Sequence, residues 1–296
     1  MNFNVEVKDL FLSYKDFVAL KYLSFRLEDK KIYGLIGRNG AGKTSLLSLL
    51  ASLREPTKGS ITIAGVPPIE NPEIMQNVAF IHQADYRDET STAKKLLELV
   101  AQYRPNYDAT YAEYLVQRFN LPVDRAVNKL SQEMQAVLDV IIGLASRAPL
   151  TIFDEVYLGM DASARMIFYQ EILDDQAKFP RLFIISTHLV PEMDNLFDEV
   201  LILHQGRLIL KEESKALISR GLTITGPVTE VDEFVQDRNV IGEKHVGKTK
   251  VVMVFADNNT ENNEELKKEA QRRGFEASQI SLQDLFIQLT DEREEN

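Results

Sequence analysis

The sequence predicts an α/β fold, and three features support that prediction. Short apolar runs of the kind that form buried parallel strands recur through the first two thirds of the chain. Several of these runs end in polar or charged residues. Stretches with helical periodicity separate them, as in strand–helix–strand units.

The apolar pattern sets the expected elements. It predicts strands over residues 5–11, 23–27, 31–36, 60–63, 78–81, 150–155 and 182–185. A hairpin is expected over 200–203 and 207–210, with its turn at Gln205-Gly206. Apolar residues at i, i+3, i+4 spacing predict helical structure over 92–121. The same spacing predicts a helix from Ser131, as its N-cap, to about Ser146.

A glycine-rich turn joins the strand at 31–36 to a helical pattern. It matches the P-loop sequence G-x-x-x-x-G-K-[ST] with Gly37, Arg38, Asn39, Gly40, Ala41, Gly42, Lys43 and Thr44, which Ser45 follows. Glycines let successive N–H groups converge on a phosphate, and the helix adds the positive end of its dipole. Lys43 would reach the β- and γ-phosphates, and the Thr44 hydroxyl would ligate Mg²⁺. A mere surface turn would not need all these positions, so the sequence predicts a nucleoside triphosphate site.

Length and composition exclude several classes of function. A chain of 296 residues can hold one large domain and a small one, and 44% hydrophobic with 27% charged residues is ordinary for a globular protein. The absence of cysteine excludes disulfides and thiolate metal sites. The net charge of −11 argues against a nucleic-acid partner. No apolar run approaches the roughly 18 residues of a membrane span, and the N-terminus is not expected to be a signal peptide.

Polar side chains follow three expected strands where each strand ends. His82-Gln83, Asp154-Glu155 and Ser186-Thr187-His188 hold these positions. The carboxyl ends of parallel strands meet at one edge of a sheet, where open α/β folds bind ligands. We therefore expect these residues around one phosphate crevice. The alternatives are a solvated strand end for the carboxylates and a loop histidine without a ligand for His188.

Beyond about residue 221 the pattern changes. Residues 221–227 suggest a polar break, followed by a strand at 251–255, a charged helix at 264–273, a strand at 275–280 and a final helix at 282–289. An acidic tail occupies 291–296. The sequence thus predicts two domains, residues 1–218 and a small α+β appendage over 219–296.

Over roughly residues 3–215 the chain resembles the nucleotide-binding subunits of ABC transporters. The resemblance rests on the P-loop and on further motifs in the family's order: Tyr14 at the adenine-stacking position, Gln83 at the Q-loop, residues 150–155 as Walker B, Gly159 and Asp161 at the D-loop, and His188 as the switch histidine. It implies the ABC-ATPase form of the P-loop NTPase fold, with a RecA-like core, an antiparallel β subdomain and a helical subdomain at about 84–146. Within the superfamily the sequence looks most like the ATPases of bacterial ABC-2-type exporters, and more weakly it resembles the subgroup that handles antimicrobial or surfactant peptides in Gram-positive bacteria.

The resemblance also implies roles. ATP and Mg²⁺ would be the cofactors, with Asp154, Thr44 and Gln83 around the metal. Glu155 would be the general base, and its carboxylate neighbour is expected to raise its pKa. His188 would hydrogen-bond the γ-phosphate, while Ser131 and Asp161 would act at the nucleotide.

The partners implied are transmembrane permease subunits, which would hold the chain on the inner face of the cell membrane. The tyrosine-rich helical insertion would dock them, unless its tyrosines are simply core residues. Other readings are a regulatory subunit that binds ATP with little hydrolysis, and a non-transport ABC ATPase acting on DNA or ribosomes.

One motif departs from the family. The signature loop, usually LSGGQ, here reads Leu130-Ser131-Gln132-Glu133-Met134. Glu133 replaces a glycine that faces the opposite subunit's ATP, and a carboxylate about 5 Å from a phosphate charge costs about 3 kcal/mol at an effective dielectric of about 20. The alternative is that Glu133 only stabilises the first helical turn. This loop favours a heterodimer with an intact second ATPase subunit over a homodimer.

Overall fold

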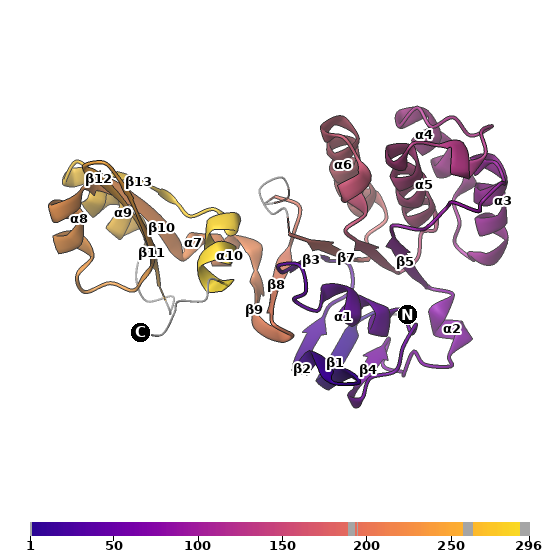
Figure 1. Ribbon diagram of the computed structural model, residues 1–296, viewed down its shortest axis with the longest axis horizontal. Helices are drawn as coiled ribbons and strands as arrows, with labels where there is room; N and C mark the ends of the chain where they lie inside the picture. The colour runs from indigo at the N-terminus through magenta and orange to yellow at the C-terminus, as the bar shows by residue number, and fades with distance from the viewer. Residues whose placement is uncertain (1, 189–192, 194, 257–262, 291–296) are drawn as a thin grey trace. The chain divides into compact units, whose positions relative to one another are not determined.

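A six-stranded sheet forms the centre of the larger part of the chain (Figure 1). Its strand order is β5 (Val78–His82), β6 (Leu150–Asp154), β7 (Leu182–Thr187), β3 (Ile32–Ile36), β8 (Glu199–His204) and β9 (Arg207–Glu213). The first five strands run parallel. Every residue of β3 and β6 is buried, because both faces of the sheet are covered. The continuous apolar runs therefore predicted these strands correctly.

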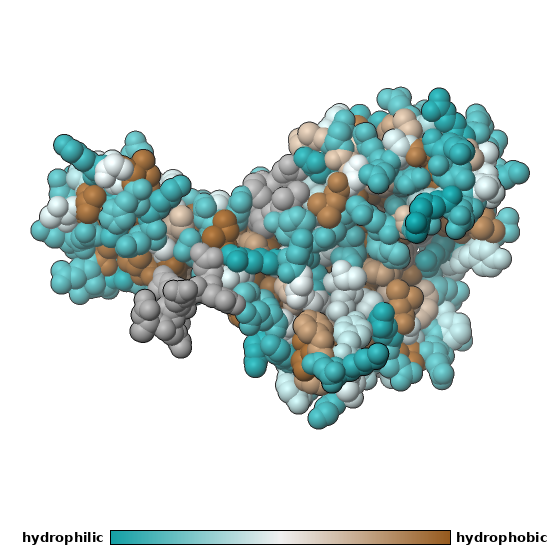
Figure 2. Space-filling model, viewed as in Figure 1, coloured by the Kyte–Doolittle hydropathy of each residue, from teal (hydrophilic) through white to brown (hydrophobic). Residues whose placement is uncertain are grey.

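The computed structural model describes residues 2–188, 193, 195–256 and 263–290. Two compact units divide the chain: residues 1–188 with 196–211, and residues 189–195 with 212–296. The expected acidic tail at 291–296 lies outside the described residues. In the part of the chain that is described, no helix has the length and apolar character needed to span a membrane. Figure 2 shows hydrophilic residues over most of the visible face, with hydrophobic ones scattered among them.

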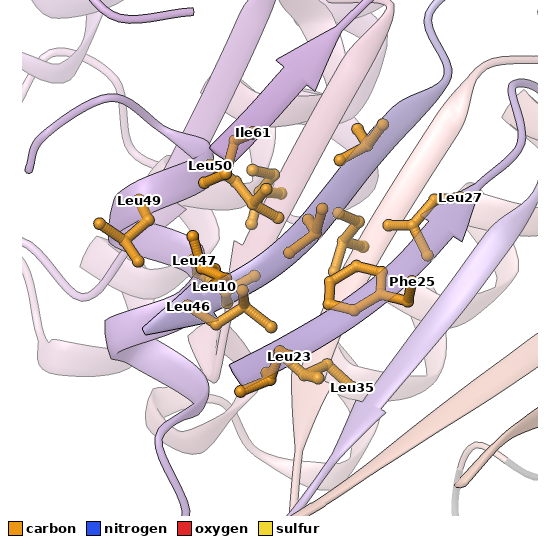
Figure 3. Close-up of a cluster of buried hydrophobic side chains, with 14 of the residues drawn as sticks. Leu10, Leu23, Phe25, Leu27, Leu35, Leu46, Leu47, Leu49, Leu50 and Ile61 are labelled. Atoms are coloured by element: carbon orange, nitrogen blue, oxygen red, sulfur yellow. The ribbon is translucent and has the colours of Figure 1, made fainter. Parts of the chain in front are cut away.

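An antiparallel sheet of three strands packs on the P-loop helix. Its order is β2 (Phe17–Leu27), β1 (Val5–Tyr14) and β4 (Lys58–Ile63). Alternate residues of β1 and β2 point into one apolar cluster with helix α1 (Lys43–Leu50), as Figure 3 shows. Both strands of the hairpin are longer than predicted, so that Tyr14 ends β1 and the turn is Lys15-Asp16. This cluster fixes the helix that begins at Lys43.

The helical part of the first unit contains three capped helices. They are α3 (Ala93–Tyr103), α4 (Ala109–Arg118) and α5 (Gln132–Ala145), with N-caps Thr92, Asp108 and Ser131. The expected helical stretch at 92–121 is thus two helices, and the cap at Ser131 is confirmed. A Cβ on Gly143 would lie 2.6 Å from the Phe153 ring, so α5 packs closely on β6.

Other elements of this unit were not predicted from the sequence. They are the long helix α6 (Ala162–Lys178), the short helix α2 (Pro72–Met75), and the 3₁₀ turns η1 (Val127–Lys129) and η2 (Val156–Gly159). Helix α6 carries Glu171, whose buried carboxylate accepts hydrogen bonds from the hydroxyls of Tyr111 and Tyr114 on α4. At least two of the insertion's tyrosines therefore tie the helical part to α6.

The second unit has the β-α-β-β-α-β order of ferredoxin-like domains. The elements are β10 (Gly221–Pro227), α8 (Val228–Val235), β11 (Val240–Val246), β12 (Thr249–Phe255), α9 (Asn263–Arg272) and β13 (Glu276–Gln279), flanked by α7 (Ser214–Ser219) and α10 (Leu282–Thr290). The sheet is antiparallel, in the order β11-β12-β10-β13. Its core lies between the sheet and helices α8 and α9.

The expected polar break at 221–227 is wrong, because this segment is the central strand β10. Leu222 and Ile224 point into the core, whereas the alternate positions are glycine and threonine. Gly221 is required by packing, since a Cβ there would lie 2.0 Å from the Ile280 side chain. The strands at 249–255 and 276–279 and the helices at 263–272 and 282–290 agree with the predictions within three residues.

The β1–α1 cluster yields a stability prediction. Leu10 is 0% exposed in this cluster, so Leu10→Ala should lower the free energy of unfolding of the first unit by about 2–5 kcal/mol. Chemical denaturation of the full chain measures this change. Leu99→Ala, at a position 47% exposed, is the control and should change it by less than about 1 kcal/mol. Equal losses for the two variants would contradict the assignment of the core.

Candidate functional site

The P-loop takes a conformation that needs its glycines. Gly40 and Gly42 have φ angles of 81° and 105°, in the left-handed region. A Cβ on Gly42 would also lie 2.9 Å from the carbonyl oxygen of Ala19. The loop therefore passes closely over β2 and delivers Lys43 to the first turn of α1.

Lys43 is the buried cation of the site. Its side chain is 5% exposed, and its Nζ donates to the carbonyl oxygen of Gly37 at 2.7 Å and lies 3.0 Å from Glu155 Oε1. A buried ammonium needs such partners because desolvation is costly. The P-loop lysine and the second carboxylate after β6 thus lie together.

Glu155 lies just beyond β6 with φ at 51°, a left-handed conformation that is unfavourable for a side chain with a Cβ. Its Oε1 is 3.1 Å from His188 Nδ1. The hydroxyl of Ser186, at the end of β7, donates to Asp154 Oδ1 at 2.5 Å and accepts from the Glu155 N–H at 3.0 Å. The Ser186 hydroxyl therefore bonds both the carboxylate of Asp154 and the backbone of Glu155.

Tyr157 is a site residue that the sequence analysis missed. Its buried hydroxyl lies 2.9 Å from Thr187 Oγ1 and accepts from the His188 N–H at 3.3 Å. The Tyr157 hydroxyl thereby fixes the backbone at His188. The only sequence signal was an aromatic residue two places after Glu155, which is too general to assign.

The expected rise in the pKa of Glu155 is wrong. Burial raises the pKa of this carboxyl, but hydrogen bonds from His188 and Lys43 outweigh burial and lower it. The nearby cations thus dominate over a carboxylate neighbour. With Lys43 paired to it, Glu155 stays ionised at neutral pH.

Two clefts meet at Thr44, Ser45 and Glu155. The first has a volume of 280 Å³ and is lined mainly by the P-loop, together with Phe17 and Ala19. The second has a volume of 460 Å³ and includes Gln83, Asp154 and Tyr14. The remaining residues of the second cleft are Ser48, Leu53, Arg54, Phe80, His82 and Leu158.

The aromatic residues of the β1–β2 turn divide between the clefts. Tyr14 faces the second, where its hydroxyl donates to Ser45 Oγ at 3.3 Å and the Arg54 guanidinium lies 5.1 Å from its ring centroid. Phe17 is 62% exposed and lines the P-loop cleft. Phe17 is therefore a second candidate for stacking on a base, and the sequence analysis did not identify it.

The second cleft has the donor set for a hard cation. Thr44, Gln83 and Asp154 all line it, and they offer a hydroxyl, an amide and a carboxylate oxygen. Among the described residues no three His, Cys, Asp or Glu side chains group into a metal site. Mg²⁺ commonly keeps few protein ligands and completes its shell with phosphates and water, so these residues fit it.

Ser131 and Asp161 lie away from both clefts and cap helices. Ser131 Oγ accepts from the Met134 N–H at 3.2 Å, and Asp161 Oδ1 accepts from the Ala164 N–H at 2.7 Å. Glu133 is half-buried in the first turn of α5. Within the single chain these residues do not meet the P-loop cleft.

A P-loop at the carboxyl edge of a parallel sheet, faced by two carboxylates and a histidine, defines a P-loop NTPase. Comparison with known proteins narrows this class. A family model described as ABC transporter matches residues 20–157. A solved structure described as the ATP binding subunit of an ABC transporter superposes with a TM-score of 0.64 at 25% identity, covering 78% of this chain and 92% of that one.

Two relatives agree with this match. The ABC transporter ATP-binding protein YtrB of Bacillus subtilis is 27% identical over 196 residues, which are 66% of this chain and 67% of that protein. The Nod factor export ATP-binding protein I of Sinorhizobium fredii is 29% identical over 220 residues, 72% of this chain and 64% of that protein. In sequence and in fold, the first part of the chain is therefore similar to the ATP-binding proteins of ABC transporters.

The Glu155 contacts yield a prediction about its titration. His188→Ala should raise the pKa of Glu155, because one donor is lost while burial remains. In the wild type, the lowered pKa of Glu155 stabilises the folded chain. This stabilisation is present above pH 4.5, the ordinary pKa of the group, and is lost as the pH falls through the pKa in the folded state. Carboxyl-carbon NMR measures the pKa, with Glu155→Gln to assign the signal. His245→Ala, in the second unit, should leave it unchanged, and an unmoved pKa in His188→Ala would refute the assignment.

Phe17 and Tyr14 can be separated by nucleotide binding. If Phe17 stacks on the base, Phe17→Ala should weaken binding of a fluorescent ATP analogue by about 5- to 100-fold, since one base stacked on an aromatic ring contributes about 1–3 kcal/mol. Tyr14→Ala should then have a smaller effect. A larger loss of affinity in Tyr14→Ala than in Phe17→Ala would show that Tyr14 stacks on the base. Inorganic triphosphate, which has no base, should bind equally to both variants.

Proposed function

We propose that this chain is the motor subunit of an ABC exporter, which hydrolyses ATP and drives transport through separate transmembrane subunits. The observation that carries the proposal is the position of Glu155, 3.0 Å from Lys43 and 3.1 Å from His188 beside the P-loop. Binding of a nucleotide alone does not require that Glu155, His188 and Lys43 lie together. The export ATP-binding protein of Sinorhizobium fredii supports the direction of transport.

The chain's own residues supply the chemistry in this proposal. ATP phosphates compete with Glu155 for the Lys43 ammonium, which frees the carboxylate to accept a proton from water. His188 orients the carboxylate and the γ-phosphate. Mg²⁺, when bound beside Thr44, Gln83 and Asp154, neutralises charge on the phosphates.

The signature loop supports an asymmetric pair of ATP sites. In the proposed closed dimer, the α5 N-terminus of one subunit meets the partner's ATP. Here Glu133 in the first turn of α5 adds a negative charge to that end. We infer that the chain pairs with a different ATPase subunit whose intact signature completes the site built on this P-loop. The peptide-exporter subgroup stays a prediction, as does the boundary near residue 218.

A second function has one observation in its favour. Glu133 would also suit a regulatory subunit that binds ATP and turns it over slowly. Turnover measured with the transmembrane subunits present separates the two proposals, because a motor accelerates with its partners and a sensor does not.

The signature loop yields a test with purified chain. Alone, the wild type should hydrolyse ATP slowly, and Glu133→Gly should raise kcat more than about tenfold, since about 3 kcal/mol of repulsion is removed. Glu133→Gln separates the charge from the missing glycine, and Glu155→Gln is the inactive control. Fast wild-type turnover with little gain in Glu133→Gly would overturn the heterodimer and favour a symmetric homodimer.

A further inference from the structure

The segment after β5 carries Gln83 and has little regular structure. Residues 82–88 are exposed except for Tyr86, which is half-buried. Farther along, the carbonyl oxygens of Glu89 and Ser91 accept hydrogen bonds from the backbone N–H groups of Asn128 and Val127, respectively. Gln83 lies between β5 and those bonds, so its position depends on the contacts of Tyr86 and the residues beside it.

A buried carboxylate on α5 holds this part of the segment. Asp139 is 6% exposed and accepts a short hydrogen bond from the Tyr86 hydroxyl. The Tyr86 hydroxyl and the backbone N–H of Ala84 act to lower the pKa of Asp139, but burial has the larger effect. Burial raises the pKa of Asp139 to about 6, so at neutral pH the group is mainly a carboxylate and only accepts.

The bond between Tyr86 and Asp139 holds the segment on the carboxyl side of Gln83, and the sheet holds it on the other side. His82, the preceding residue, pairs in register with Asp154 in β6. Tyr86, three residues after Gln83, is bonded to Asp139. Gln83 is thus presented to the cleft that it shares with Thr44 and Asp154.

The surroundings of Asp139 argue that it serves more than packing. Its neighbours Leu138 and Val140 are fully buried, and an apolar residue at 139 would avoid the cost of burying a carboxylate. A buried charge that is hydrogen-bonded to a loop instead fixes the conformation of that loop. Its bond to Tyr86 leads to the segment that carries Gln83, and Gln83 lines the second cleft with the proposed metal ligands Thr44 and Asp154.

We propose that Tyr86 and Asp139 are positioning residues that hold the Gln83 amide toward the metal in the ATP site. This inference rests on the role of Gln83 in the proposed function. Partners behind a metal ligand typically change metal affinity by about 10- to 100-fold. Helix α5 therefore acts in its own subunit's ATP site through Asp139, while its N-terminus faces away from that site.

The test is a metal titration that does not require turnover. Mn²⁺ is titrated into the full chain bound to AMPPNP, a nucleotide that is not hydrolysed, and bound Mn²⁺ is measured by electron paramagnetic resonance. Tyr86→Phe and Asp139→Asn should each weaken Mn²⁺ affinity about tenfold, with AMPPNP affinity in the absence of metal unchanged. Tyr111→Phe is the matched control, because it removes a tyrosine–carboxylate bond to Glu171 in the same helical part and should leave Mn²⁺ affinity unchanged.

The decisive arm repeats Tyr86→Phe in a Gln83→Ala background. If Tyr86 acts through Gln83, it should weaken Mn²⁺ affinity less than twofold there. An equal loss in both backgrounds, or no loss from Tyr86→Phe while Gln83→Ala alone weakens binding, overturns the positioning role and leaves the proposed function standing. No loss from Gln83→Ala removes the metal role of Gln83 itself, and this inference with it.

Discussion

The buried ammonium of Lys43 is the interaction on which the site depends. It joins the end of β3, the start of α1 and the end of β6, because its partners are the carbonyl oxygens of Gly37 and Arg38 and the carboxylate of Glu155. An ammonium with so little exposure is stable only while these acceptors surround it. Any ligand that supplies phosphate oxygens must exchange with one of them, and Glu155 is the acceptor on a side chain that can move. In the proposed function, this one charge therefore couples nucleotide binding to the release of the Glu155 carboxylate.

The parallel sheet brings the reacting groups to that charge. Strands β5, β6, β7 and β3 run in one direction, so the residues that follow them gather at one edge. Ser186 in β7 then bonds the Asp154 carboxylate and the Glu155 backbone at the end of β6, and Tyr157 bonds the backbone of His188. Helix α5 contributes from outside the sheet, since its buried Asp139 reaches the loop after β5. Strand order places these residues, and a few buried hydroxyls set their orientation.

The sequence predicted the elements whose pattern matches their burial. Strands β3 and β6 are continuous apolar runs, and the P-loop is recognisable because each of its positions has a chemical reason. Helix α6 was missed because Glu171 and Asp175 point inward while Met166 and Leu173 are exposed, which breaks the helical periodicity. Strand β10 was missed because glycine and threonine fill its second face. Tyr86 and Asp139 are 53 residues apart, and nothing local links them. Tertiary contacts of this kind have no sequence period.

The left-handed backbone of Glu155 has an evolutionary consequence. A non-glycine residue in this conformation costs about 1–2 kcal/mol relative to one that adopts it freely. Glycine or asparagine at this position would relieve that cost, and either would remove the carboxylate that acts as base in the proposed function. Substitutions that increase stability at position 155 would therefore remove the base of the proposed function. In a transporter with two unequal ATP sites, the site that is no longer needed for turnover could lose its base with a gain in folding stability.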